Sequence, residues 1–220
     1  MAGYMLLYKR YVKKYSDAIE YTRQYLEKTA AMNPSGLHPW NLPEHRMNHT
    51  LLVLKYSFLL AKNRKVNLDV IALSAILHDI ATFSSGRKEH AEEGAKVAEE
   101  YLRKHDYPDN LVHEVVHSIR AHVGPLAFRP RSDEAKILQD ADTFDKVGAL
   151  GVTTFLLHCG NKKMLPEQAL AELKKEMPRR LKWCYRTMNF PQGKRMIGEG
   201  CNYAREFIRR LENEAHILEP

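Results

Sequence analysis

The sequence predicts an all-α protein. Apolar residues recur at helical spacing along most of the 220 residues, and no segment alternates convincingly between apolar and polar side chains. Glycine and proline are scarce, at 11 and 10 residues, and no stretch is of low complexity. A chain of this length has enough material for a large core, so we expect one all-α domain over residues 1–220.

The expected helices follow from apolar periodicity between breakers, and they cover residues 5–31, 45–63, 68–80, 88–105, 109–123, 134–148, 150–160, 166–188 and 194–216. Breakers at 33–36 and 82–86, and a loop with Gly124, Pro125 and Pro130, separate several of them. Asp69 and Ser132 are candidate N-terminal caps. We expect a bundle core at about 40–160, braced by an N-terminal helix and a C-terminal helical extension at about 161–220.

Charge and composition limit the functional classes. The net charge of +7 favours anionic ligands such as phosphates or nucleotides. Nucleic acid is not the expected partner, because no zinc finger or compelling recognition helix is present. No run of about 18 apolar residues occurs, so we expect no membrane span. The N-terminus does not resemble a secretory signal. Three widely spaced cysteines fit a reducing compartment, and we expect a cytoplasmic protein.

Four histidines share apolar stripes on four different expected helices. Each lies at a spacing of three, four or seven from apolar residues of its own helix, and they are His49, His78, His90 and His122. A single inward histidine is commonly a core residue that bonds to backbone, but four in one small domain favour a shared site. His113 and His117, by contrast, lie on a polar face, and we expect a structural or surface role for both.

Carboxylates accompany these histidines. Asp79 directly follows His78 at the end of the apolar run 71–77, where burial is costly unless another group pairs with the side chain. Periodicity does not choose between Asp140 and Asp142 further along, because either can face inward. A divalent metal would pair with such a set of imidazoles and carboxylates.

The order of these residues resembles the HD-domain superfamily of metal-dependent phosphohydrolases, over roughly residues 45–150. The similar strings are His49-Thr-Leu-Leu-Val53, Ala75-Ile-Leu-His-Asp-Ile80, His90-Ala-Glu-Glu-Gly94 and Asp140-Ala-Asp-Thr-Phe-Asp-Lys-Val-Gly148. The segment 186–210 also looks similar to the helical tail of small bacterial and archaeal members, some of which hydrolyse nucleotides. The resemblance implies an HD-domain helical bundle that cleaves a phosphate ester or phosphoanhydride of a nucleotide or related small molecule.

The resemblance also implies the site residues. The metal ligands carried over are His49, His78, Asp79 and Asp142, because the family ligand is the aspartate directly after the alanine. The residues expected to take part in catalysis are His78, Asp79, His90 and His122. The positions of His90 and His122 bind a second metal or contact substrate phosphate in some relatives. This mixed nitrogen and oxygen set suits Mn, Fe, Co, Ni, Zn or Mg.

Basic residues near these motifs could hold the substrate anion, and they are Arg87, Lys88, Arg129, Arg131 and Lys146. The subclass that cleaves cyclic dinucleotides is not expected, since Val-Gly-Pro follows His122 in place of its signature. Two alternatives stay open. One is a mixed-valence di-iron oxygenase of the same fold, with six inward ligands; the other is a non-catalytic basic helical binding module.

Overall fold

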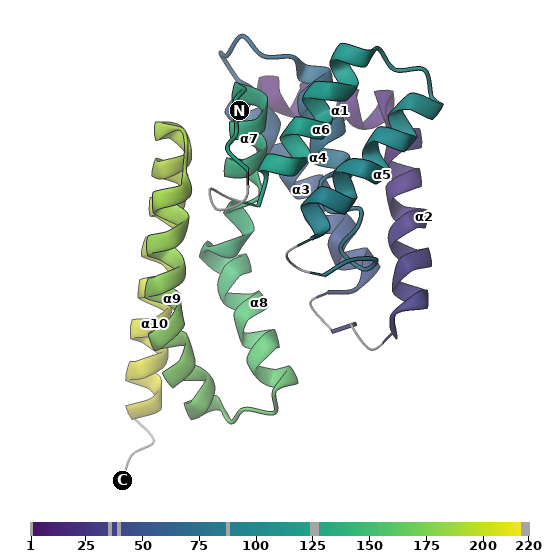
Figure 1. The fold of residues 1–220 in the computed structure, drawn as a ribbon. Helices are drawn as coiled ribbons and strands as arrows, with labels where there is room; N and C mark the ends of the chain where they lie inside the picture. Colours follow the sequence, from purple (N-terminus) through teal and green to yellow (C-terminus); the bar gives the residue numbers. More distant parts are fainter. Residues whose placement is uncertain (1, 35–36, 39–40, 87–88, 124–127, 217–220) are drawn as a thin grey trace. The chain divides into compact units, whose positions relative to one another are not determined.

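The computed structural model of the chain describes residues 2–34, 37–38, 41–86, 89–123 and 128–216 (Figure 1). All regular secondary structure in these ranges is helical, which confirms the expected all-α class. The chain divides into two compact units. The first contains residues 1–37 and 41–142, and the second contains residues 38–40 and 143–220. The expected division into a core of about 40–160 and an extension stays a prediction.

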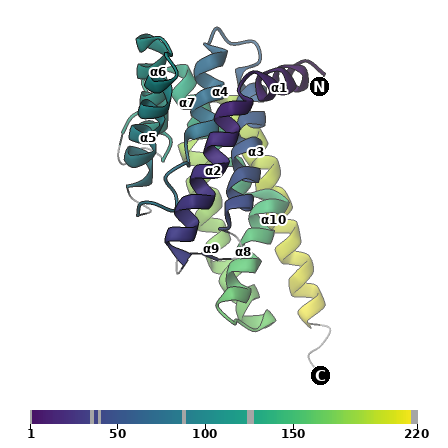
Figure 2. The same ribbon diagram turned by 90° about the vertical axis from the view of Figure 1, so that its right-hand side faces the viewer.

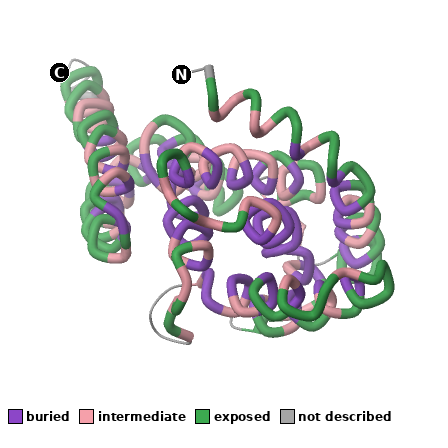
Figure 3. Tube along the Cα trace, turned by 90° about the horizontal axis from the view of Figure 1, so that it is seen from above, coloured by how far each residue is buried: buried purple, intermediate pink, exposed green. Residues whose placement is uncertain are grey.

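The first unit is built around a short buried helix. Its helices are α1 (Ala2–Lys14), α2 (Ser16–Met32), α3 (Pro43–Ala61), α4 (Leu68–Leu77), α5 (His90–Lys104), α6 (Asp109–Ala121) and α7 (Asp133–Ala141). All residues of α4 from Val70 to Leu77 are buried, and α4 packs against α2, α3, α5, α6 and α7. Figure 3 shows the buried stretches of these helices turned toward the interior of the unit.

Burial of α4 fixes the point at which the chain leaves this helix. Ile71, Leu73, Ile76 and Leu77 are at most 1% exposed, and burying each such side chain contributes about 1.5–3 kcal/mol. The helix α3 lies against α4, and α2 runs along both (Figure 2). The residues that follow Leu77 are therefore held from several sides.

The N-terminal region differs from the expected helix 5–31. Two helices are present, separated at Tyr15, which has φ −115° and ψ 33°. The Tyr15 hydroxyl donates to Asp69 Oδ1 at 2.7 Å, and Lys14 Nζ lies 2.5 Å from the same oxygen. The prediction of Asp69 as a cap was wrong. The cap of α4 is Asn67, whose side-chain oxygen accepts from the backbone N–H groups of Asp69 and Val70.

The helices around the expected site end earlier than periodicity predicts. The expected helix 68–80 ends at Leu77, and the expected helix 109–123 ends at Ala121. The expected helix 134–148 is α7 followed by a turn and the 3₁₀ helix η2 (Phe144–Lys146). Gly148 then has φ +66°, a left-handed conformation that a helix cannot continue through. Ser132 is confirmed as a cap, because its hydroxyl accepts from Ala135 N.

The second unit contains η2 and three longer helices, α8 (Gly148–Asn161), α9 (Pro166–Thr187) and α10 (Pro191–His216). The helices α9 and α10 lie side by side (Figures 1 and 2). Their buried residues include Leu173, Met177 and Cys184 from α9, and Ile197 and Cys201 from α10. None of the described helices combines the length and the apolar character needed to cross a bilayer.

Two glycines of α8 give a matched test of packing in the second unit. A Cβ atom at Gly151 would lie 2.5 Å from the carbonyl carbon and oxygen of Lys146, whereas a Cβ at Gly160 would meet nothing within 4 Å. Gly151→Ala should lower the free energy of unfolding by about 1–3 kcal/mol, as overpacking does. Gly160→Ala should leave it unchanged or raise it by up to about 1 kcal/mol. Urea unfolding monitored by circular dichroism measures both, and equal effects would contradict this packing.

Candidate metal centre

Two histidines reach the centre of the first unit by the same local device. His78 and His122 follow the last residues of α4 and α6, and each ring turns back on its own helix. His78 Nδ1 lies 2.9 Å from Ala75 O, and His122 Nδ1 lies 2.7 Å from Ile119 O. Because a carbonyl only accepts, each Nδ1 carries a hydrogen and donates it. This bond holds each ring against its own helix, and in the neutral ring it leaves Nε2 with a lone pair.

A first cluster forms around His49 of α3. Its Nε2 lies 3.2 Å from His78 Nε2, 3.2 Å from Asp142 Oδ1 and 3.5 Å from Asp79 Oδ2. His78 Nε2 lies 3.6 Å from Asp79 Oδ2 and 3.8 Å from Asp142 Oδ1. All four residues are at most 9% exposed. Two imidazoles and two carboxylates thus point their ligand atoms at a common point.

A second cluster shares Asp79 with the first but uses its other oxygen. Asp79 Oδ1 lies 3.5 Å from His90 Nε2 and 3.6 Å from His122 Nε2, and these two nitrogens are 3.2 Å apart. The ligand atoms of Asp79, His90 and His122 all lie within 4.8 Å of one another, as do those of His49, His78 and Asp79. The Asp79 carboxylate therefore stands between two groups of donors that could each hold an ion.

The electrostatics of both clusters favour a cation. Burial lowers the pKa of His78 to about 4; the charge of Asp79 opposes this effect, and the neighbouring His122 and His49 add to it. Burial opposes protonation of His122 as well, but the hydrogen bond to Asp79 raises the pKa of His122 above its ordinary value. The C-terminal caps of α4, α6 and α7 are His78, His122 and Asp142. Their C-terminal dipole ends add negative potential at this point.

Arg46 is a site residue that the sequence analysis missed. Its Nη1 lies 3.1 Å from Asp79 Oδ2, and its Nε donates to Asn41 Oδ1 at 2.7 Å. Burial would raise the pKa of Asp79, but His78, His122 and Arg46 hold it well below the ordinary value. Its position in the sequence could have indicated this role, since Arg46 lies one helical turn before His49. The Arg46 side chain is 23% exposed, so a positive charge stands between the buried cluster and solvent.

The placement of His90 depends on close packing of α5 against α4. A Cβ atom at Gly94 would lie 3.2 Å from the backbone oxygen of His78 and 3.8 Å from both Ala81 and Ile119 side chains. Glycine at this position lets α5 approach the end of α4. His90, one turn earlier on α5, then comes within reach of Asp79.

The structure brings together every histidine and aspartate expected at the site, namely His49, His78, Asp79, His90, His122 and Asp142. Asp142 approaches His49 and His78, which favours it over Asp140 as a ligand; the assignment stays a prediction, as do the catalytic roles. Asp140 is itself fully buried in α7.

The basic residues expected to hold substrate have different surroundings. Arg131 lies against Phe128 and His117 on the outer side of α6, and Arg129 is exposed. Lys146 belongs to the second unit, where its Nζ lies 5.8 Å from the centroid of a Trp183 ring. Arg87 and Lys88 lie outside the described residues.

Residues 46–146 match the family model of the HD domain. This segment of the chain is an HD domain. The matched segment of this HD protein contains all six histidines and aspartates of the two clusters and Arg46.

Solved structures share the fold of this HD protein along nearly its whole length. An HD-superfamily hydrolase from Bacillus thuringiensis has 22% identity and a TM-score of 0.67, with 91% of this chain and 98% of that chain covered. A predicted HD-superfamily hydrolase from an uncultured Thermotogales bacterium has 23% identity and a TM-score of 0.62, with 90% and 91% covered.

A third similar structure is Bacillus subtilis YpgQ in complex with ADP, with 18% identity and a TM-score of 0.63. The alignment covers 90% of this chain and 95% of that chain. No curated protein matched this HD protein.

Replacing Gly94 by valine should disturb the second cluster. The Cβ would already crowd His78 O at 3.2 Å, and the branched methyl groups add volume at a closed interface. Gly94→Val should lower the free energy of unfolding by about 1–3 kcal/mol, although valine itself favours a helix more than glycine does. Urea unfolding measures the loss. Lys96→Ala, on an exposed face of the same helix, should change it by less than about 0.5 kcal/mol, and an equal loss would contradict the role of Gly94.

Proposed function

We propose that this HD protein is a metal-dependent phosphohydrolase that cleaves a phosphate ester or phosphoanhydride of a nucleotide or related small molecule. The observation that carries the proposal is the first cluster. His49, His78, Asp79 and Asp142 converge within 3.2–3.8 Å inside an HD domain. Such a set would leave coordination positions of an octahedral ion for water and for a substrate oxygen.

The donor chemistry fits a divalent ion. Two neutral imidazoles and two carboxylates suit Mn, Fe, Co, Ni, Zn or Mg. The Nδ1–H of His78 is held by Ala75 O, which is the kind of outer contact that orients a histidine ligand. His49, His78, Asp79 and Asp142 would hold the first ion. Asp79, His90 and His122 would hold a second one.

When bound, the ion would polarise the phosphoryl group and lower the pKa of its bound water. The chain's own residues would do the rest. Arg46, partly exposed beside Asp79, would attract and orient a substrate oxygen by a charge-assisted hydrogen bond. If only one ion binds, His90 or His122 could donate a proton to the leaving group. The Nδ1–H bonds to the ends of α4 and α6 would hold the imidazoles of His78 and His122 in place during this step.

A nucleotide is the substrate class that we favour. The structure of YpgQ, which shares this fold, is one in complex with ADP. The net charge of +7 also favours an anionic substrate. The predicted phosphate contacts remain Arg129, Arg131 and Lys146, together with Arg87 and Lys88, which lie outside the described residues. Cytoplasmic localisation likewise stays a prediction, and the three cysteines are free thiols.

The second cluster favours one further candidate, a mixed-valence di-iron oxygenase. Asp79 faces both donor groups with different oxygens, so a pair of ions could share it. Ion stoichiometry and the fate of oxygen separate the two functions. Two bound irons with oxygen-dependent turnover would select the oxygenase. A single exchangeable ion with release of phosphate would exclude it.

Removal of Asp79 should abolish both ion binding and phosphate release. Asp79→Ala deletes oxygens that belong to both clusters, so no ion-loaded form should persist. His90→Ala removes a donor from the second cluster alone and should keep the first ion. Elemental analysis of protein reconstituted with Mn, Co, Ni or Mg gives the ion count, and a phosphate-release screen over nucleotides gives activity.

Two outcomes would contradict this proposal. One is full phosphate release by Asp79→Ala. The other is a folded wild type that cannot be reconstituted with any of these ions, which would support the non-catalytic binding module. Thermal melts of each variant, and of the near-isosteric Asp79→Asn, separate loss of ions from loss of fold.

Arg46→Gln should raise KM for the nucleotide about tenfold or more, since a charge-assisted hydrogen bond contributes roughly 1.5–3 kcal/mol. The ion count should stay unchanged, because Arg46 supplies no donor atom to either cluster. Arg23→Gln removes an exposed arginine of α2 and should leave KM within about twofold. Steady-state phosphate release over a range of substrate concentrations measures both. An unchanged KM in Arg46→Gln would remove Arg46 from substrate binding.

A further inference from the structure

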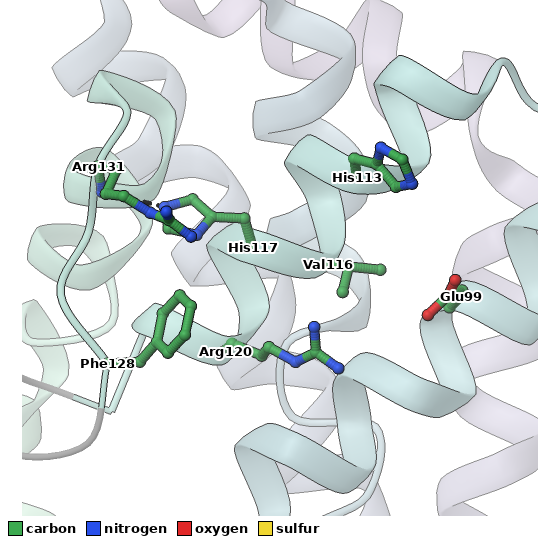
Figure 4. A pocket seen from close by; sticks show the side chains of 7 residues that line it. All are labelled: Glu99, His113, Val116, His117, Arg120, Phe128 and Arg131. Atoms are coloured by element: carbon green, nitrogen blue, oxygen red, sulfur yellow. Dashed lines mark hydrogen bonds between the residues drawn. The ribbon is translucent and has the colours of Figure 1, made fainter.

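A cavity of about 330 Å³ lies on the outer side of α6, away from the metal centre (Figure 4). Its lining comes from α5, α6 and the segment 128–131, and it includes His113, Val116, His117, Arg120, Phe128 and Arg131. The volume is at the lower end of the range of small-ligand pockets, roughly 300–1,000 Å³. The only acidic group in its lining is Glu99.

Helix geometry separates this cavity from the metal centre. His113, His117 and Arg120 follow one another at spacings of four and three residues, so they form one stripe along α6. His122 is two residues beyond Arg120 and therefore lies on a nearly opposite face of the helical path. No residue of the cavity lining belongs to either metal cluster.

The charge that faces the cavity is positive. Arg120 donates two hydrogen bonds to Glu92, at 3.0 and 2.9 Å, and Glu99 is paired with Arg103. Arg131 differs, because its guanidinium lies 5.6 Å from the centroid of the Phe128 ring and forms no ion pair with a carboxylate of the described residues. The Arg131 charge is therefore the one that the surrounding groups do not balance.

His117 has a ring nitrogen without a hydrogen-bond partner, and an anion could accept a hydrogen bond from it. Its Nε2 accepts a hydrogen bond from Arg131 N at 3.0 Å, so the neutral ring carries its hydrogen on Nδ1. That Nδ1 is buried and has no hydrogen-bond partner among the described residues. Burial lowers the pKa of His117; Arg131 and Arg120 lower it further, and Glu114 opposes them.

We propose that this cavity is a second binding site of the protein, one that takes the phosphate group of a small molecule. Arg131 supplies the charge, its guanidinium geometry matches phosphate oxygens, and a modest shift of the segment 128–131 opens His117 Nδ1–H to one of them. The remaining volume beside Phe128 accommodates the group that carries the phosphate. A neighbouring cavity of about 500 Å³ that shares His113 is lined by Glu114 and Glu134, which disfavours an anion there.

The test uses the full chain without metal, so it does not depend on the proposed hydrolysis. Isothermal titration calorimetry in EDTA measures the binding of ADP, inorganic phosphate and adenosine. ADP and phosphate should bind saturably, and adenosine should not. Arg131→Gln should weaken the binding of ADP about tenfold or more, and thermal melts should show that this exposed substitution leaves the fold intact.

Two controls locate the site. Arg23→Gln, a partly exposed arginine elsewhere in the unit, should bind ADP within about twofold of the wild type. In NMR spectra, ADP should shift the imidazole signals of His113 and His117 and leave that of His78 in place. Three results would overturn the proposal: unchanged affinity in Arg131→Gln, a shift of the His78 signal in place of those of His113 and His117, or adenosine binding as tightly as ADP.

Discussion

The structure depends on how it accommodates four buried imidazoles around the single carboxylate of Asp79. Imidazole nitrogens of His49, His78, His90 and His122 all approach Asp79 within 3.5–3.6 Å, in a region almost closed to water. Desolvated acceptors at these distances repel one another unless positive charge lies among them. Arg46 supplies part of that charge at the edge of the cluster. The arrangement of donors therefore suits a cation.

The fold meets this requirement largely with helix ends, although His49 lies within α3. Burial of α4 on all sides fixes His78 and Asp79, which are the first two residues after it. The ends of α6 and α7 deliver His122 and Asp142 to the same place. His78 keeps helical backbone angles, φ −58° and ψ −40°, and Asp79 follows it, so both side chains reach the centre from the end of α4.

Periodicity was enough to predict the helical class and the inward direction of the four histidines, since both depend on which side of a helix is apolar. It predicted that two helices end at residues 80 and 123, whereas they end at Leu77 and Ala121. The reason is that an Nδ1–H bond to the preceding turn competes with continuation of the helix. Asn67 replaced Asp69 as a cap because Asp69 pairs with Lys14 and Tyr15 from distant sequence. Arg46 was missed for a similar reason: its partner, Asp79, becomes a neighbour only in the folded chain.

Because both donor groups contain Asp79, substitutions at different residues of the site would affect the evolution of its chemistry differently. A substitution at Asp79 removes an oxygen from both donor groups at once, so neither group would be complete for binding an ion. A substitution at His90 or His122 leaves the set around His49 complete. On the proposed function, one substitution at His90 or His122 would separate a two-ion form from a one-ion form that keeps the first donor group. The second cluster could then change without loss of the first.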